Sequence, residues 1–225
     1  MANQENNQVK FYHSPWSRST SVLWLLEELG VPYDLRVVNV HKPETVQESY
    51  RAIQPHKKVP AVQHGSLVVT ERAAITIYLA DKFSAAGLAP ALDDPMRARY
   101  LTTLVYCDAV FDPCVTAHVR GLRPAGADYS FGAYEDMLDN VERRLSEHPF
   151  AAGDRFTAAD TQLASSLGYT IHFLKAVPLR PAFDAYLKRV LGREANVRAQ
   201  QIDAELAERH INNSGQASVV QEPAS

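Results

Sequence analysis

The chain has 225 residues, 46% of them hydrophobic, which is enough for one or two domains with a substantial core. Lys and Arg number 23 and Asp and Glu 26, and the net charge of −3 argues against a general nucleic-acid-binding protein. No apolar run of about 18 residues predicts a transmembrane helix, and the polar start MANQENNQVK is not a secretory signal, so we expect a cytoplasmic protein with no membrane partner.

The first 40 residues predict a parallel βαβ unit. Val9–Tyr12 and Tyr33–Val40 have patterns typical of strands. Between them, Ser17–Leu29 carries a broad apolar stripe typical of a helix, and Gly30 stands where a C-terminal cap belongs. A strand, a helix and a strand in this space favour a right-handed crossover.

The next 45 residues complete an α+β domain. A polar, weaker helix is expected over 43–53. Val59–Val62 and Ser66–Val69 flank His64-Gly65 and predict a hairpin, and a helix follows over 73–83. The prediction is a four-stranded sheet with helices on its faces, within a domain spanning 8–84.

Beyond this domain the pattern becomes purely helical. Residues 85–95 contain Gly87, Pro90 and Pro95 and are interpreted as a linker. The expected helices cover 96–120 (bent near Pro113), 131–147, 157–174, 182–191 and 194–209, with a loop at 121–126. We therefore expect an all-α helical-bundle domain over 96–210, followed by a disordered tail over 211–225.

One helix start is clear from the sequence alone. In Phe156-Thr157-Ala158-Ala159-Asp160, the Thr157 side chain can cap the helix and the Asp160 carboxylate can reach back to the amide of Thr157. This capping box has a structural explanation and needs no functional one.

The cysteines and histidines indicate neither a disulfide nor a metal site. Cys107 and Cys114 are seven residues apart, which in one helix is roughly 10 Å along the axis, too far for a disulfide. No CxxC occurs, and the eight histidines show no HxxxH spacing. We expect two buried, inert thiols and no metal.

Three segments of the first domain carry groups suited to binding an anionic ligand. Ser14-Pro15-Trp16-Ser17-Arg18-Ser19 is a hydroxyl-rich turn before a helix, whose first amides favour an anion. In Gln54–Pro60, a cis bond at Pro60 would leave the preceding backbone groups free to pair with an extended ligand. Thr70–Ile75 places charged groups where a strand gives way to a helix.

These segments resemble the cytosolic glutathione transferase family. The matching stretches are SRSTSVLWLLEELGVPY, QPHKKVPAV, TERAAITIYL and, in the second domain, FTAAD. They follow the family's order over about residues 8–175, and the first stretch is most similar to serine-type, theta-like members from bacteria and fungi. The resemblance implies a thioredoxin-like N-terminal domain followed by an all-α domain.

The resemblance also implies conjugation of glutathione, as co-substrate, to a hydrophobic electrophile, with no prosthetic group. A free thiol with a pKa near 8.5 is only about 3% thiolate at pH 7. Lowering its pKa by about 2 units requires about 2.7 kcal/mol, which a hydroxyl hydrogen bond and a helix terminus can supply. The serine then donates to the thiolate and attacks nothing.

Ser17 best matches the family's serine, with Ser14 and Ser19 as alternatives within one turn. Trp16 lies where some theta-like members would place their serine, which leaves the register open by one residue. The other explanation of Ser17 is that it only caps the helix. Because no cysteine occurs from 1 to 106, chemistry through a mixed disulfide is disfavoured.

The resemblance assigns the rest of the glutathione site residue by residue. Val59 would pair its backbone with the cysteinyl part, Pro60 would be cis, and Lys58 would neutralise the glycyl carboxylate. Glu71 would hold the γ-glutamyl ammonium. The family usually has Ser or Thr next, where this chain has Arg72. The amide of Arg72 can still bind, and its guanidinium is left to pair with the γ-glutamyl carboxylate, to face solvent or to reach a partner subunit.

The second substrate would lie between the domains, against the long helix that starts at Met96. The candidates are Tyr106, Val110, Phe111, Pro113 and His118. Each is also explained as ordinary core or surface. The prediction is a homodimeric glutathione transferase, and the alternatives are a non-catalytic module that binds glutathione or hydrophobic ligands and a glutathione-dependent peroxidase.

Overall fold

The computed structural model describes residues 8–122 and 129–212, and it begins with a four-stranded sheet. The strands are β1 (Val9–His13), β2 (Tyr33–Val37), β3 (Ala61–His64) and β4 (Leu67–Thr70), in the order β2-β1-β3-β4. β1 and β2 are parallel, whereas β3 is antiparallel to both β1 and β4. The predicted parallel unit and hairpin are confirmed.

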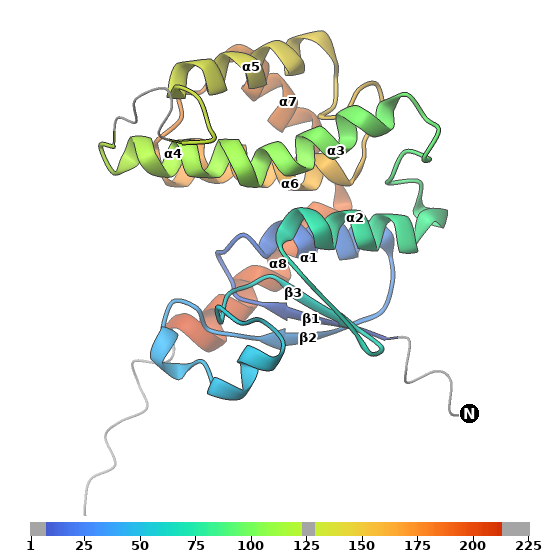
Figure 1. The fold of residues 1–225 in the computed structure, drawn as a ribbon, viewed down its shortest axis with the longest axis vertical. Helices are drawn as coiled ribbons and strands as arrows, with labels where there is room; N and C mark the ends of the chain where they lie inside the picture. Colours follow the sequence, from blue (N-terminus) through green and yellow to red (C-terminus); the bar gives the residue numbers. More distant parts are fainter. Residues whose placement is uncertain (1–7, 123–128, 213–225) are drawn as a thin grey trace, which may run out of the picture.

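Two helices lie between the sheet and the helical domain (Figure 1). They are α1 (Thr20–Leu29) and α2 (Arg72–Lys82). The apolar stripe of α1 is buried, and Gly30 ends the helix in the left-handed conformation, with its N–H donating to Leu26 at 3.1 Å. α1 starts at Thr20, three residues later than expected, so Ser17 lies in the turn before the helix.

The expected helix over 43–53 is wrong. This stretch forms two short 3₁₀ segments, η2 (Pro43–Thr45) and η3 (Glu48–Ala52). Only Val46 and Tyr50 are buried, so no apolar stripe fixes a regular helix against the sheet.

The long helix predicted over 96–120 is present but its centre is wound differently. α3 (Met96–Tyr106) passes into a π-helical turn, η5 (Cys107–Phe111), and then into α4 (Asp112–Val119). Pro113, which cannot donate a backbone hydrogen bond, lies in the first turn of α4, directly after the π-helical turn.

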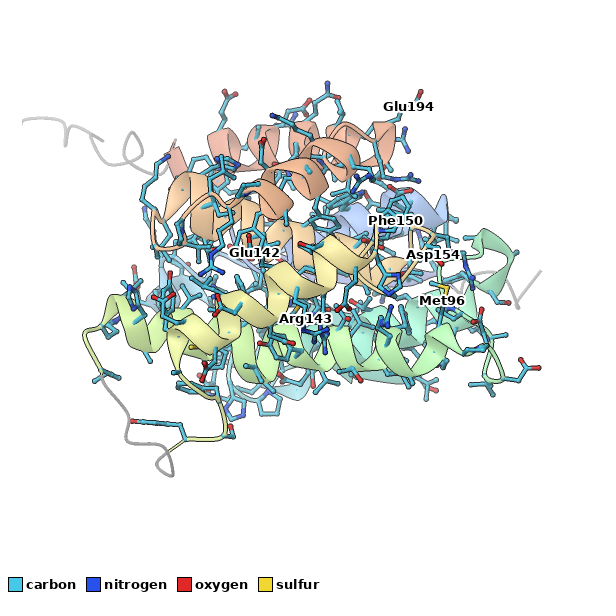
Figure 2. The ribbon with its side chains drawn as sticks, turned by 90° about the horizontal axis from the view of Figure 1, so that it is seen from above. Met96, Glu142, Arg143, Phe150, Asp154 and Glu194 are labelled. Atoms are coloured by element: carbon cyan, nitrogen blue, oxygen red, sulfur yellow. The ribbon has the colours of Figure 1, made fainter. Side chains whose placement is uncertain are left out.

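Four more helices complete the described part of the chain. They are α5 (Tyr134–Glu147), α6 (Ala158–Gly168) with its π-helical continuation η6 (Tyr169–Phe173), α7 (Pro181–Val190), and α8 (Glu194–Ala207) with its continuation η7 (Glu208–Asn212). Of these, α7 packs on α6, α5 packs on α7 and α8 packs on α1. α6 is buried along most of its length and contacts α1, α3 and α7. Figure 2 looks down on this layer and shows Glu142 and Arg143 on α5. Glu142 accepts a 2.8 Å hydrogen bond from Arg180, just before α7.

The predicted capping box at the start of α6 is confirmed. Oδ2 of Asp160 accepts from the N–H of Thr157 at 2.8 Å. Oδ1 of Asp160 also accepts from the N–H of Ala151 at 2.8 Å and from the hydroxyl of Tyr186 at 3.0 Å. This one fully buried carboxylate therefore joins α6, α7 and the loop before α6.

α8 returns from the helical domain and runs along α1 (Figure 1). Arg193 holds Glu28 with hydrogen bonds of 2.6 and 2.8 Å, and Arg198 holds Glu27 at 2.9 Å. The first turns of α8 are thus tied to the last turn of α1.

The remaining sequence predictions are the linker over 85–95, the loop over 121–126 and the C-terminal tail. In 85–95 no α-helix occurs before Met96, and the carbonyl of Leu88 accepts from the N–H of Ala158 at 2.9 Å. Residues 123–126 of the predicted loop and 213–225 of the predicted tail lie outside the described residues. Within the described ranges, no helix combines the length and apolar character needed to cross a bilayer.

Candidate functional site

The register of the strands brings the three candidate segments together at one end of the sheet, where β1 and β4 end and β3 begins. Ala61 pairs with Tyr12 on one side and with Thr70 on the other. The turn after β1, the cis-proline turn before β3 and the first residues of α2 therefore emerge side by side. α1 and α2 begin at this end of the sheet, and both lie between the sheet and the helical domain (Figure 1).

The turn between β1 and α1 is held by a compact set of hydroxyl hydrogen bonds. Oγ of Ser17 lies 2.8 Å from the carbonyl of Ser14, 2.7 Å from Oγ of Ser19, and accepts from the N–H of Ser19 at 3.1 Å. Trp16 has a φ of 56°, a conformation that side-chain-bearing residues rarely adopt. The turn thus has one defined shape with Ser17 at its outer side.

A buried histidine and a carboxylate from α8 lie beneath this turn. Nδ1 of His13 is 2.7 Å from Oγ of Ser19. Nε2 of the same ring is 2.8 Å from Oδ1 of Asp203, at an angle outside hydrogen-bond geometry. Asp203 also accepts from the N–H of Trp16 at 3.1 Å and from Oγ1 of Thr20 at 3.2 Å. Both His13 and Asp203 are buried.

The segment before β3 presents free backbone groups. The Val59–Pro60 bond is cis. Oε1 of the buried Gln54 accepts from the N–H groups of His56 and Lys58, at 2.7 and 3.2 Å, which fixes the loop. Lys58 is exposed. Within the described residues, the backbone of Val59 has no hydrogen-bond partner, so it is available to an extended ligand.

Glu71 and Arg72 point in different directions at the start of α2. Glu71 is exposed and has a φ of 67°. The Arg72 side chain is only 4% exposed; it binds Asp108, lies 2.9 Å from Asp112 and donates to Oγ of Ser166 at 3.1 Å. The guanidinium therefore faces the helical domain of its own chain and is shielded from solvent.

A cavity of about 410 Å³ lies between the two domains. Its lining residues come from the turn before α1, from the start of α2, and from the helical domain. They are Trp16, Ser17, Arg18, Thr20, Arg72, Asp112, Ala164, Ser165, Ser166, Gly168, Tyr169, His172, Phe173, Leu191, Asn196, Gln200 and Asp203. Of the predicted glutathione residues, Ser17 and Arg72 are in this lining, whereas Lys58, Val59, Pro60 and Glu71 are not.

The five predicted second-substrate residues do not line the cavity. Phe111 is fully buried in the core, and the Arg144 guanidinium lies 5.2 Å from the ring centre of Tyr106. Val110 and Pro113 are partly buried, and His118 is exposed and stacks on Tyr134 at 3.7 Å. The π-helical turn η5 lies in this region, where the spacing of an ordinary helix no longer predicts which side chains face the cavity.

Sequence reasoning missed the aromatic wall from η6, formed by Tyr169 and Phe173 with His172. It also missed the partly buried carboxylates of Asp108 and Asp112 and the buried carboxylate of Asp203. One signal was available for Asp203. Ala199, Asp203 and Ala207 recur every four residues, and all three are buried on the face toward α1. A carboxylate within a stripe of small residues indicates a specific partner.

Cysteine and metal chemistry have no support among the described residues. Cys107 and Cys114 are both free and buried, and burial raises the pKa of each thiol. No group of three or more His, Cys, Asp or Glu residues in the described ranges is placed to hold a metal ion.

Both domains match known families. Residues 7–81 match the family "Glutathione S-transferase, N-terminal domain" and residues 105–194 match "Glutathione S-transferase, C-terminal domain". Glutathione S-transferase F13 of Arabidopsis thaliana is 29% identical over 182 residues, which cover 75% of this chain and 82% of the relative. Maleylpyruvate isomerase of Ralstonia sp is 29% identical over 175 residues, which cover 69% and 80%.

A solved structure shares the same arrangement. A sphingomonad glutathione S-transferase complexed with glutathione is 26% identical, superposes with a TM-score of 0.71, and is matched over 87% of this chain and 98% of its own. The family matches and the superposition thus indicate the same two domains in the same order. The chain belongs to the glutathione S-transferase family.

Proposed function

We propose that the chain transfers glutathione, as its thiolate, to a hydrophobic electrophile, and that the hydroxyl of Ser17 stabilises the thiolate. The observation that carries the proposal is the position of Ser17. Of Ser14, Ser17 and Ser19, only Ser17 lines the cavity between the domains, while the other two are fully buried. The Ser17 hydroxyl donates to the carbonyl of Ser14 at 2.8 Å and accepts from the N–H of Ser19, and a sulfur placed in the cavity accepts the Ser17 proton once the hydroxyl turns away from that carbonyl.

The rest of the tripeptide fits the end of the sheet where β3 begins and β4 ends. The free backbone of Val59 is suited to the cysteinyl part, and the exposed groups of Lys58 and Glu71 are suited to the glycyl carboxylate and the γ-glutamyl ammonium. Because Asp108, Asp112 and Ser166 engage the Arg72 guanidinium, we assign the γ-glutamyl carboxylate to the amide of Arg72 at the start of α2.

The electrophile would occupy the cavity. The exposed rings of Trp16, Tyr169 and Phe173 provide an apolar surface at its wall. Such a surface selects a hydrophobic, planar molecule and excludes water from the thiolate. Glutathione is a co-substrate in this scheme, and a homodimer and a cytoplasmic location are further parts of the proposal.

Replacing Ser17 with alanine should lower kcat/KM for conjugation of a generic aryl halide by about tenfold or more, with little change in retention on immobilised glutathione. The loss reflects one hydrogen bond to a charged sulfur. The matched control is Ser146→Ala, which removes an exposed hydroxyl on α5 that donates to the carbonyl of Glu142. An unchanged rate in the Ser17 variant would remove Ser17 from the mechanism.

The same wild-type assays separate the alternatives. Retention on the column without turnover of any acceptor would identify a binding module. Turnover of an organic hydroperoxide in place of the aryl halide would identify a peroxidase, which uses the same thiolate.

A further inference from the structure

We propose that His13, held by Asp203, receives the proton of the glutathione thiol through the hydroxyls of Ser19 and Ser17. The inference deepens the proposed function and rests on it. Stabilising a thiolate explains why the proton leaves the sulfur but not where it goes. The structure offers a path from the cavity to a buried base.

The path consists of four side chains in contact. Ser17 lines the cavity, and its Oγ lies 2.7 Å from Oγ of Ser19. Oγ of Ser19 lies 2.7 Å from Nδ1 of His13, and Nε2 of His13 lies 2.8 Å from Oδ1 of Asp203. Every member after Ser17 is buried, so bulk water does not compete for these contacts.

The carboxylate decides which nitrogen of His13 carries the proton. A lone pair on Nε2 facing the carboxylate of Asp203 would be repelled, so the neutral ring carries its proton on Nε2. Nδ1 is then an acceptor, and the hydroxyl of Ser19 donates to it. The ring is thereby set to take up a second proton at Nδ1, on the side that faces the cavity.

The transfer balances without any further reactant. The Ser17 hydroxyl first turns from the carbonyl of Ser14, to which it donates, toward Oγ of Ser19. The S–H bond then breaks as the thiol proton moves to Oγ of Ser17, the Ser17 proton moves to Oγ of Ser19, and the Ser19 proton moves to Nδ1 of His13. The products are the thiolate, two intact hydroxyls and an imidazolium beside the Asp203 carboxylate. The hydroxyl dipoles now point toward the sulfur, so the same step leaves Ser17 donating to the thiolate.

The charged and titratable groups that the structure describes around this path have other partners or lie on the cavity wall. On the cavity side, the Arg18 guanidinium lies 2.8 Å from Asp112, and Arg72 binds Asp108 and Asp112. After β2, Nε2 of His41 lies 2.8 Å from the carbonyl of Pro15. His172 lines the cavity from η6. Glu27 and Glu28, at the far end of α1, are paired with arginines of α8.

Asp203 also has a structural role that must be separated from this one. Its carboxylate accepts from the N–H of Trp16 and from Thr20, which fixes the turn. Asp203→Asn keeps an oxygen for the N–H of Trp16 but removes the negative charge beside Nε2 of His13. Without that charge the imidazolium is no longer stabilised, so uptake of the proton is disfavoured.

The test is the pKa of bound glutathione, followed by the ultraviolet absorbance of the thiolate across pH, together with the pH profile of kcat/KM. Asp203→Asn and Ser19→Ala should each raise the thiol pKa by about 1 unit, a tenfold loss of thiolate below that pKa, with KM for glutathione unchanged. The double variant should shift no further than either single variant, since both interrupt one path. The control is Glu28→Gln, which removes another α8–α1 ion pair and should leave the pKa in place.

A thiol pKa that stays at the wild-type value in Asp203→Asn or in Ser19→Ala would overturn the relay, and so would additive shifts in the double variant. These results differ from failure of the proposed function, which would appear as an unperturbed thiol pKa in the wild type. If Asp203→Asn does not fold, Ser19→Ala decides alone, because it interrupts the path without touching α8.

Discussion

Replacing Asp160 with alanine is expected to lower the free energy of unfolding by about 3–5 kcal/mol. The carboxylate is fully buried and accepts from the N–H groups of Thr157 and Ala151 and from the hydroxyls of Thr157 and Tyr186. Alanine leaves these donors buried without that acceptor, and each unsatisfied donor costs about 1–3 kcal/mol. Because α6 is the central helix of the second domain, urea denaturation should show the loss in the midpoint of the whole transition.

Two further variants show how the loss of stability depends on the number of buried hydrogen bonds that are broken. Tyr186→Phe removes one donor and keeps the carboxylate, so about 1 kcal/mol is expected. Asp184→Ala removes an exposed carboxylate that is paired with Lys188 on α7, and should cost less than about 0.5 kcal/mol. An Asp160→Ala variant as stable as Asp184→Ala would show that the donors find other partners.

The pH dependence gives a second readout of the same carboxyl group. Burial outweighs the hydrogen bonds and raises the pKa of Asp160 to about 6. Between pH about 4 and about 6 the folded chain then holds a proton that the unfolded chain has lost, so this group's contribution falls as pH rises. Relative to Asp160→Asn, the wild type should lose roughly 3 kcal/mol of unfolding free energy across that window. A difference that grows with pH would mean a lowered pKa.

The parts of the fold that could be predicted have local causes. Gly30 ends α1 because glycine, which has no side chain, adopts the left-handed conformation without a steric clash. The capping box needs only Thr157 and Asp160, three residues apart. Alternating burial of Val9, Phe11 and His13 marks β1. Each signal lies within one element, so the surrounding fold does not alter its meaning.

The candidate site likewise has parts that follow from short sequence motifs and parts that depend on how distant elements pack. The turn around Ser17 and the segment around Pro60 could be proposed from the sequence because each is a short, continuous motif. Asp203 could not, since it meets Trp16 across 187 positions of sequence and its role depends on how α8 packs on α1. The cavity wall from η6 was missed because a π-helical turn changes which side chains face inward.

The ion cluster around Arg72 shows how a departure from the family pattern is accommodated. Where the family usually has a small hydroxyl residue, the guanidinium reaches from α2 to Asp108 on η5, to Asp112 on α4 and to Ser166 on α6. Oδ2 of Asp108 also accepts from the N–H of Ala73 at 3.0 Å. The two carboxylates outweigh the effect of burial and raise the pKa of Arg72. The cluster therefore links the domains beside the proposed glutathione site.

Arg72→Ala should accordingly lower the free energy of unfolding by about 3–5 kcal/mol, because it leaves Asp108 and Asp112 facing each other without their shared buried partner. Arg18→Ala removes an arginine that is 48% exposed and paired with the same Asp112, and should cost about 1 kcal/mol or less. Adding Asp108→Asn to Arg72→Ala should restore part of the loss, since it removes one unpaired charge. Urea denaturation of the four proteins at one pH measures all three differences. Equal costs for Arg72→Ala and Arg18→Ala would show that burial gives the cluster no added strength, and that the domains are held together chiefly by the packing of α8 and α6 on α1.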